Sequence, residues 1–129
     1  MNLNLLISVK PKYVKEILTG KKRYEFRKSI FKKPINKIYI YSTVPERKIV
    51  GYFDYKGYIK ESPMILWEKT KEFSGINKDE YFDYFNKKEN AYAIIIESFH
   101  IFDEPINPKD KIRNFVAPQS YKYINGDIF

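Results

Sequence analysis

Apolar and polar positions at the start of the chain follow patterns typical of a strand and a short helix. Residues 3–9 are mostly apolar, which indicates a strand. Pro11 stands where a helix can begin, and Gly20 stands where one typically ends. Between them the apolar residues recur on one helical face: Tyr13, Val14, Ile17 and Leu18. We therefore predict a strand at 3–9 and an amphipathic helix at 11–19.

Three further strands are predicted between residues 23 and 58. Residues 23–27 alternate, with Tyr24 and Phe26 on one face and charged residues on the other. After a basic loop at 28–36, the segment 37–41 is apolar on both faces, which is typical of a buried strand. Residues 48–58 are predicted to form one long strand, in which Gly51 permits a bend or a close backbone approach.

The middle of the chain predicts two helices, and the last third predicts a strand and an irregular tail. One helix is expected at 63–70, and Asn77 is a good N-cap for another that ends at Phe85. Residues 91–96 form an apolar run typical of a buried strand, which 99–102 extend past a bulge, and 119–123 are expected to form a short turn or helix. Together the elements indicate an α+β fold: a small β-barrel with an amphipathic N-terminal helix and two helices inserted in the middle.

Composition limits the chemistry that the chain can carry. Its 129 residues suffice for one core, so we expect a single domain over 1–129. The chain has no cysteine, which excludes disulfides, a disulfide-linked partner and thiolate metal sites. His100 is its single histidine, so we expect neither a metal nor another cofactor. Residues 1–9 lack the features of a signal peptide and no apolar run is long enough for a membrane span, so we expect a cytoplasmic protein.

Basic residues are concentrated in one segment. Residues 10–37 hold eleven Lys or Arg and two acidic residues, whereas the other positions hold 13 basic and 14 acidic residues. The formal net charge is +8, so this segment carries the entire excess. The asymmetry favours a polyanion partner, because each phosphate that a Lys or Arg neutralises releases counterions. The alternative is a solvated surface that keeps the protein in solution.

One short motif stands within the basic segment. Gly20, Lys22, Glu25 and Arg27 fit the spacing G-x-K-x-x-E-x-R, between the predicted helix and the following strand. Glu25 and Arg27 are two residues apart in that strand, so they share one face. Arg27 can bind a phosphate or a base edge through two parallel hydrogen bonds. The alternative is an internal ion-pair network that only fixes the helix to the rest of the fold.

The motif and its surroundings resemble the ASCH domain, a PUA-like fold. The resemblance extends to Tyr41–Pro45 followed by Ile49–Phe53, and to Pro118–Tyr121 near the C-terminus, so it covers roughly the whole chain. It implies a cleft beside the motif and recognition of RNA or of a modified base. Some ASCH proteins are amidohydrolases of an acylated cytidine, which use a lysine and a threonine nucleophile from this segment, and others are ribonucleases.

The two enzymatic possibilities make different demands on the motif. Lys22 matches the amidohydrolase lysine, but Glu25 stands where the threonine nucleophile is expected. A carboxylate at that position is expected to pair with Lys22 and to raise the pKa of the lysine. RNA cleavage by general acid–base catalysis needs two titratable groups, which Lys22 and Glu25 can supply.

Candidate site residues come from three segments. Lys22 and Glu25 are the candidate catalytic residues if the protein is an enzyme. Tyr121 can stack on a base, although core packing is the alternative for it as for Tyr41 and Tyr52. The candidate ligand-binding residues are Lys22, Arg23, Glu25, Arg27, Ser42, Thr43, Gln119, Ser120 and Tyr121.

Three functions compete at this point. The first is a binding module for nucleic acid or a nucleotide, with RNA or a modified base favoured, that uses a basic cleft beside the motif. The second is a small hydrolase, either a ribonuclease or a modified-nucleoside amidohydrolase, that uses Lys22 and Glu25. The third is a protein-interaction module built on Trp67 and residues 82–85, which leaves the basic segment unexplained. We take the first as the working hypothesis; the sequence leaves RNA versus DNA, catalysis and oligomeric state open.

Overall fold

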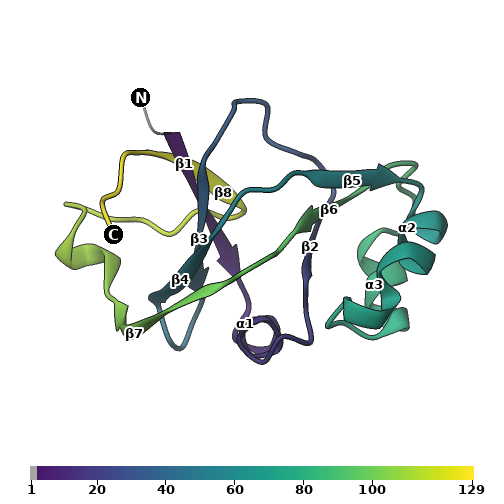
Figure 1. Cartoon of the computed structure of the whole chain (residues 1–129), viewed down its shortest axis with the longest axis horizontal. Helices are drawn as coiled ribbons and strands as arrows, with labels where there is room; N and C mark the ends of the chain where they lie inside the picture. Colours follow the sequence, from purple (N-terminus) through teal and green to yellow (C-terminus); the bar gives the residue numbers. More distant parts are fainter. Residues whose placement is uncertain (1–2) are drawn as a thin grey trace.

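Two sheets make up the framework of the protein (Figure 1), whose computed structural model describes residues 3–129. The first sheet has the strand order β7-β4-β3-β1-β8 and the second has the order β2-β6-β5. The strands of the first are β1 (Leu3–Val9), β3 (Lys37–Ser42), β4 (Lys48–Asp54), β7 (His100–Ile106) and β8 (Tyr121–Asn125). Those of the second are β2 (Tyr24–Arg27), β5 (Tyr58–Glu61) and β6 (Ala91–Ile95).

The mixed α+β class is confirmed, but the closed barrel is not, because the described strands pair into two separate sheets. The expected long strand at 48–58 is wrong for the same reason. Gly57 has φ +105° and lies between β4, in the first sheet, and β5, in the second. The extension expected at 99–102 is likewise wrong, because residues 100–102 belong to a new strand, β7, in the first sheet, after a turn in which Ser98 has φ 49°. These left-handed residues redirect the chain from one sheet to the other.

Strand pairing contradicts the expectation for residues 119–123 and confirms the one for Gly51. The turn or helix expected at 119–123 is wrong, because Tyr121–Asn125 forms β8, which pairs antiparallel with β1. This pairing supplies hydrogen-bond partners to the side of β1 that does not face β3. The close approach at Gly51 is confirmed, because a side chain there would collide with the carbonyl oxygen of His100 in β7.

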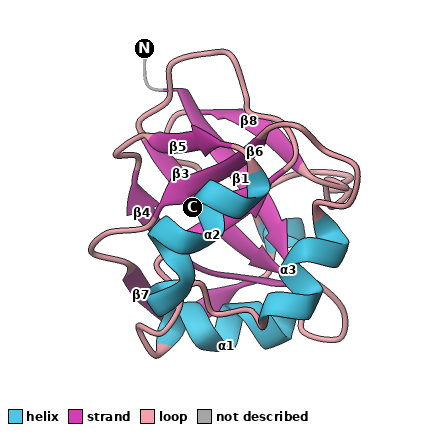
Figure 2. Ribbon diagram, turned by 90° about the vertical axis from the view of Figure 1, so that its right-hand side faces the viewer, coloured by secondary structure: helices cyan, strands magenta, loops and turns pink. Residues whose placement is uncertain are grey.

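The three predicted α-helices are present (Figure 2). They are α1 (Pro11–Leu18), α2 (Pro63–Thr70) and α3 (Lys78–Tyr84). Short 3₁₀ helices also occur: η1 (Lys71–Phe73) after α2, and η2 (Pro108–Asp110) after β7. Helix α1 ends at Leu18 with Thr19 as its C-cap, and Gly20 follows in the left-handed region at φ +80°. The side chain of Asn77 caps α3 by accepting a hydrogen bond from the backbone N–H of Glu80 at 2.8 Å.

Buried side chains form three clusters around these elements. The first lies where α1 packs on the sheets and includes Val14, Ile17 and Ile94. The second lies beneath α2 and α3 and includes Trp67, Tyr81 and Phe85. The third covers the other side of the first sheet and includes Phe115. Trp67 is 9% exposed and Phe85 2%, whereas Tyr84 is 38% exposed, so part of the aromatic surface that the protein-interaction hypothesis requires is core.

Candidate functional site

The end of α1 and the start of β2 position the motif. Gly20 turns the chain, and the backbone N–H of Lys22 donates to the carbonyl of Glu16 at 2.9 Å. Lys22 also forms an isolated β-bridge with Ser74 in the segment after η1. Gly75 has no side chain that would collide with Lys22, so this segment packs directly over the lysine. The loop between α2 and α3 therefore buries Lys22, which is 3% exposed.

Burial sets the chemistry of Lys22. Its Nζ donates to the carbonyl oxygen of Ser74 at 2.8 Å and lies 5.3 Å and 4.7 Å from the ring centroids of Tyr13 and Phe26. Burial lowers the pKa of Lys22 to about 8, because removing the ammonium from water disfavours its charge. The Glu25 carboxylate acts in the opposite direction. The expected rise of this pKa is therefore wrong, since burial outweighs the carboxylate.

Glu25 pairs with Arg27 rather than with Lys22. Nη2 of Arg27 lies 2.8 Å from Oε2 of Glu25, and the two side chains are only 12% and 10% exposed. The guanidinium also donates to the carbonyl of Ser8 at 3.1 Å and to Oγ of Ser120 at 2.9 Å. Ser8 belongs to β1 and Ser120 precedes β8, so the pair links the second sheet to the first. The two alternatives stated for the motif therefore occur together. Glu25 and Arg27 form an internal ion pair, and the same guanidinium lies at the edge of a cleft.

A cleft of about 630 Å³ runs beside these residues. Its polar lining is mixed in charge rather than basic, which corrects the expectation of a basic cleft. The acidic side is contributed largely by α3. The charged lining residues are Lys10, Lys22, Arg27, Glu25, Glu80 and Asp83. Most of the excess basic residues of 10–37 are exposed outside this lining: Lys12, Lys15, Lys21, Arg23, Lys28, Lys32 and Lys33.

The remaining candidates divide into those that line the cleft and those that do not. Thr43, Gln119 and Ser120 line it. Ser42 does not line the cleft, because successive residues of an extended chain point to opposite sides and Ser42 points away from the side of Thr43. It is fully buried, and its Oγ donates to Glu46 at 3.1 Å. The remaining two lie elsewhere: Arg23 stacks on Phe73 at 4.1 Å from the ring centroid, and Tyr121 packs against Phe31 with the ring centroids 6.1 Å apart.

Several cleft residues were not identified from the sequence. The hydroxyl of Tyr13 donates to Oε2 of Glu80 at 2.5 Å, and Lys12 reaches the same oxygen at 2.8 Å, so α1 and α3 are joined across the cleft. Tyr13 lies on the apolar stripe of α1 and only its hydroxyl is polar, so the sequence pattern indicates a core residue. Tyr84, on α3, also lines the cleft, and burial raises its pKa. Lys28 lies 4.6 Å from the centroid of its ring.

Residues 3–129 contain neither a candidate metal cluster nor a candidate membrane-spanning helix. No group of three or more His, Cys, Asp or Glu side chains is arranged to hold a metal ion within this range. No helix in the same part of the chain is long and apolar enough to cross a membrane.

Comparisons with known proteins agree with this fold. The model of the ASCH domain matches residues 7–100. An ASCH domain-containing ribonuclease from Zymomonas mobilis is 29% identical over 129 residues, covering 95% of this chain and 84% of that protein. A crystal structure of ASCH from Zymomonas mobilis superimposes with a TM-score of 0.86 at 28% identity, covering 95% of this chain and 87% of that one. The resemblance noted in the sequence is confirmed: the chain belongs to the ASCH domain family.

Proposed function

We propose that this protein binds RNA in the cleft and cleaves it there. The observation that carries the proposal is Lys22, a buried lysine with a pKa of about 8 that lines the same cleft as the Glu25–Arg27 ion pair. A lysine whose pKa is close to neutral can exchange a proton during a reaction, which an ordinary lysine does poorly. The similarity to an ASCH domain-containing ribonuclease supports RNA as the substrate.

The three residues have complementary roles in cleavage. The Glu25 carboxylate accepts the proton of a ribose 2′-hydroxyl, whose oxygen attacks the adjacent phosphorus. The bond from phosphorus to the 5′-oxygen breaks, and the Lys22 ammonium donates its proton to that oxygen. Arg27 stabilises the extra negative charge on the phosphate in the transition state. The products are a 2′,3′-cyclic phosphate and a 5′-hydroxyl, and proton exchange with water then returns Glu25 to its carboxylate and Lys22 to its ammonium form.

The mixed charge of the lining fits a nucleotide better than a bare phosphate. Lys10 and Arg27 provide cationic groups for the phosphate. Asp83, on the α3 side, provides an acceptor for the amino group of a base, and Tyr84 provides a partly exposed ring beside it. A phosphate alone would leave this acidic side without a partner.

Recognition without cleavage is a second candidate, and the ion pair itself favours it. Arg27 already holds Glu25 at 2.8 Å, so the carboxylate is fixed as an acceptor for a base amino group and need not take a proton. In this case the cleft selects an RNA or a modified base, and Lys22 contributes only charge. Binding and turnover measured on the same variants separate the two functions.

The experiment is cleavage of a short RNA, followed by analysis of its termini. Wild type is expected to yield 2′,3′-cyclic phosphate ends, and a 2′-deoxy substitution at the cut position is expected to block the reaction. Lys22→Met is expected to lower the cleavage rate at least a hundredfold, because acid–base catalysis typically contributes about 10²- to 10⁴-fold. Lys21→Met is the matched control, since Lys21 is the exposed neighbour of Lys22.

Each outcome of this experiment bears on whether the protein cleaves RNA or only binds it. Cleavage that Lys22→Met leaves unaffected contradicts the proposed chemistry. RNA binding that is weakened by Arg27→Ala, with no cleavage by wild type, supports the binding module. Absence of both binding and cleavage removes RNA as the ligand.

A further inference from the structure

One face of the second sheet continues from the cleft to the outer strand β5. Strand pairing sets Arg27 of β2 opposite Tyr92 of β6, and Tyr92 opposite Lys60 of β5. Tyr58 lies one row away, opposite Ile94. Residues that are directly paired, or two apart in one strand, share a face, so Arg27, Tyr92, Lys60 and Tyr58 lie on the same side of this sheet.

Both faces of this sheet are partly covered. On the Arg27 face, Ile94 is 1% exposed and lies in the first buried cluster, so the exposed part of that face is formed by Tyr58, Lys60 and Tyr92. The opposite face is covered by α2 and α3. Phe26, Ala91 and Ala93 face the cluster beneath α2 and α3, and Figure 1 shows these helices together at this end of the molecule. Glu61, the acidic residue of β5, also alternates away from Tyr58 and Lys60, and Lys69 binds it at 2.6 Å. The face that continues from Arg27 therefore carries aromatic rings and a lysine without that carboxylate.

The side chains on this face form a connected surface. Tyr58 is 43% exposed and Tyr92 is partly exposed, with their ring centroids 5.8 Å apart. Nζ of Lys60 lies 5.8 Å from the centroid of Tyr92. Lys56, also exposed, stands two residues before Tyr58. We name Tyr58, Lys60 and Tyr92 the β5–β6 surface.

This composition fits single-stranded nucleic acid. Bases stack on exposed tyrosines whatever their sequence, while lysines contact the intervening phosphates. Neighbouring strands lie about 4.8 Å apart, so the backbone positions of Arg27 and Lys60 are about 10 Å apart across the sheet. A chain with its phosphate at Arg27 can therefore reach Tyr92 and Lys60 with its next nucleotides.

We propose that the β5–β6 surface binds the nucleotides of a single-stranded RNA that flank those held in the cleft. The inference rests on the proposed function, because it takes Arg27 and the cleft as the point from which the strand extends. It predicts that affinity increases with the length of the RNA beyond the nucleotides that fill the cleft.

The test compares a dinucleotide with an eight-nucleotide RNA, both carrying 2′-deoxy sugars at the cut position so that they remain intact. Tyr58→Leu/Tyr92→Leu keeps apolar volume but removes both rings. It is expected to lower the ratio of the two affinities at least tenfold, given roughly 1–3 kcal/mol for each stacked base. Tyr52→Leu is the matched control, because Tyr52 stacks on His100 in the first sheet, with ring centroids 4.8 Å apart.

The outcomes separate this inference from the proposed function. A length dependence that Tyr58→Leu/Tyr92→Leu leaves intact overturns the β5–β6 surface, whereas loss of cleavage in Lys22→Met still supports the ribonuclease. A tenfold loss in the double variant, with cleavage indifferent to Lys22→Met, retains the surface and removes the proposed chemistry. If Tyr58→Leu/Tyr92→Leu changes the sedimentation coefficient of the protein but not its affinity for RNA, the surface is a protein contact and the inference is overturned.

Discussion

The guanidinium of Arg27 lies 2.8 Å from the carboxylate of Glu25 and, through its other nitrogen, 2.9 Å from the hydroxyl of Ser120. One side chain thus neutralises a nearly buried acid and joins the two sheets at the edge of the cleft. Its Nε is buried without a hydrogen-bond partner among the described residues. This arrangement gives the pair a structural role in addition to the one proposed in RNA binding.

We predict that Arg27→Ala destabilises the protein by about 3 kcal/mol, because it leaves Glu25 as an unpaired, nearly buried charge. Glu25→Gln keeps a hydrogen-bond acceptor and is expected to cost about 1 kcal/mol. Urea denaturation of both variants measures these values. Lys71→Ala removes the exposed pair with Glu68, at 2.8 Å, and serves as a control with unchanged stability. Equal effects of Arg27→Ala and Lys71→Ala contradict this prediction.

A second prediction concerns stability at high pH. An unfolded lysine holds its proton up to about pH 10.5, whereas folded Lys22 loses it near pH 8. Between these values the unfolded state binds more protons, so the contribution of Lys22 to the free energy of unfolding rises with pH. Wild type is expected to gain on the order of 3 kcal/mol relative to Lys22→Met between pH 8 and pH 10.5.

Chemical denaturation at several pH values in this window provides the measurement. Lys21→Met is the control, because Lys21 is exposed and its removal is expected to leave the pH dependence of wild type unchanged. Parallel stability curves for wild type and Lys22→Met mean that burial does not lower the pKa of Lys22.

A third prediction follows for catalysis. If Lys22 donates its proton to the leaving oxygen, the rate of RNA cleavage falls as pH rises through about 8, because the ammonium is then lost. The profile of kcat/KM against pH is the measurement, with a chemically activated leaving group as the control, since such a substrate no longer needs a proton donor. A rate that instead rises up to pH 8 reassigns Lys22 as the base.

Local signals in the sequence predict the parts of this site that depend on neighbours in the chain. Pro11 and Gly20 delimit α1, and the spacing of Glu25 and Arg27 places them on one face. The lowered pKa of Lys22 was not predictable in this way, because the segment that buries it begins some fifty residues later, at Ser74. Tyr13 and Glu80 are 67 positions apart in the sequence, so no local periodicity indicates that they pair.

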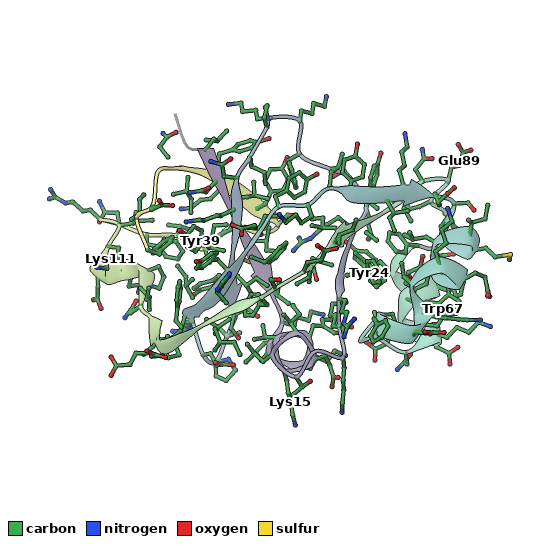
Figure 3. The ribbon with its side chains drawn as sticks, viewed as in Figure 1. Lys15, Tyr24, Tyr39, Trp67, Glu89 and Lys111 are labelled. Carbon is green, nitrogen blue, oxygen red and sulfur yellow. The ribbon has the colours of Figure 1, made fainter. Side chains whose placement is uncertain are left out.

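A fourth prediction is that RNA binding weakens with salt. The exposed basic side chains of residues 10–37 lie mostly outside the lining of the cleft, which is itself mixed in charge. The plot of log affinity against log salt is expected to slope downward, and Lys10→Ala, at the cleft, is expected to reduce that slope by about 0.7. Lys111→Ala is the control, since Figure 3 shows Lys111 at the end of the molecule opposite to α3. A flat plot for wild type contradicts an electrostatic contribution.

The last prediction is that the protein does not release cytidine from an acylated cytidine at an enzymatic rate. Lys22, with a pKa of about 8, is suited to act as a base. The missing part is the nucleophile, because Glu25 occupies its expected position and is paired with Arg27 at 2.8 Å. Ser42 is buried and its hydroxyl donates to Glu46. The hydroxyl of the next residue, Thr43, lines the cleft and is therefore the candidate nucleophile that remains in this segment. Chromatography of the reaction mixture measures release; turnover abolished by both Lys22→Met and Thr43→Val would instead establish amidohydrolase chemistry with Thr43 as the nucleophile.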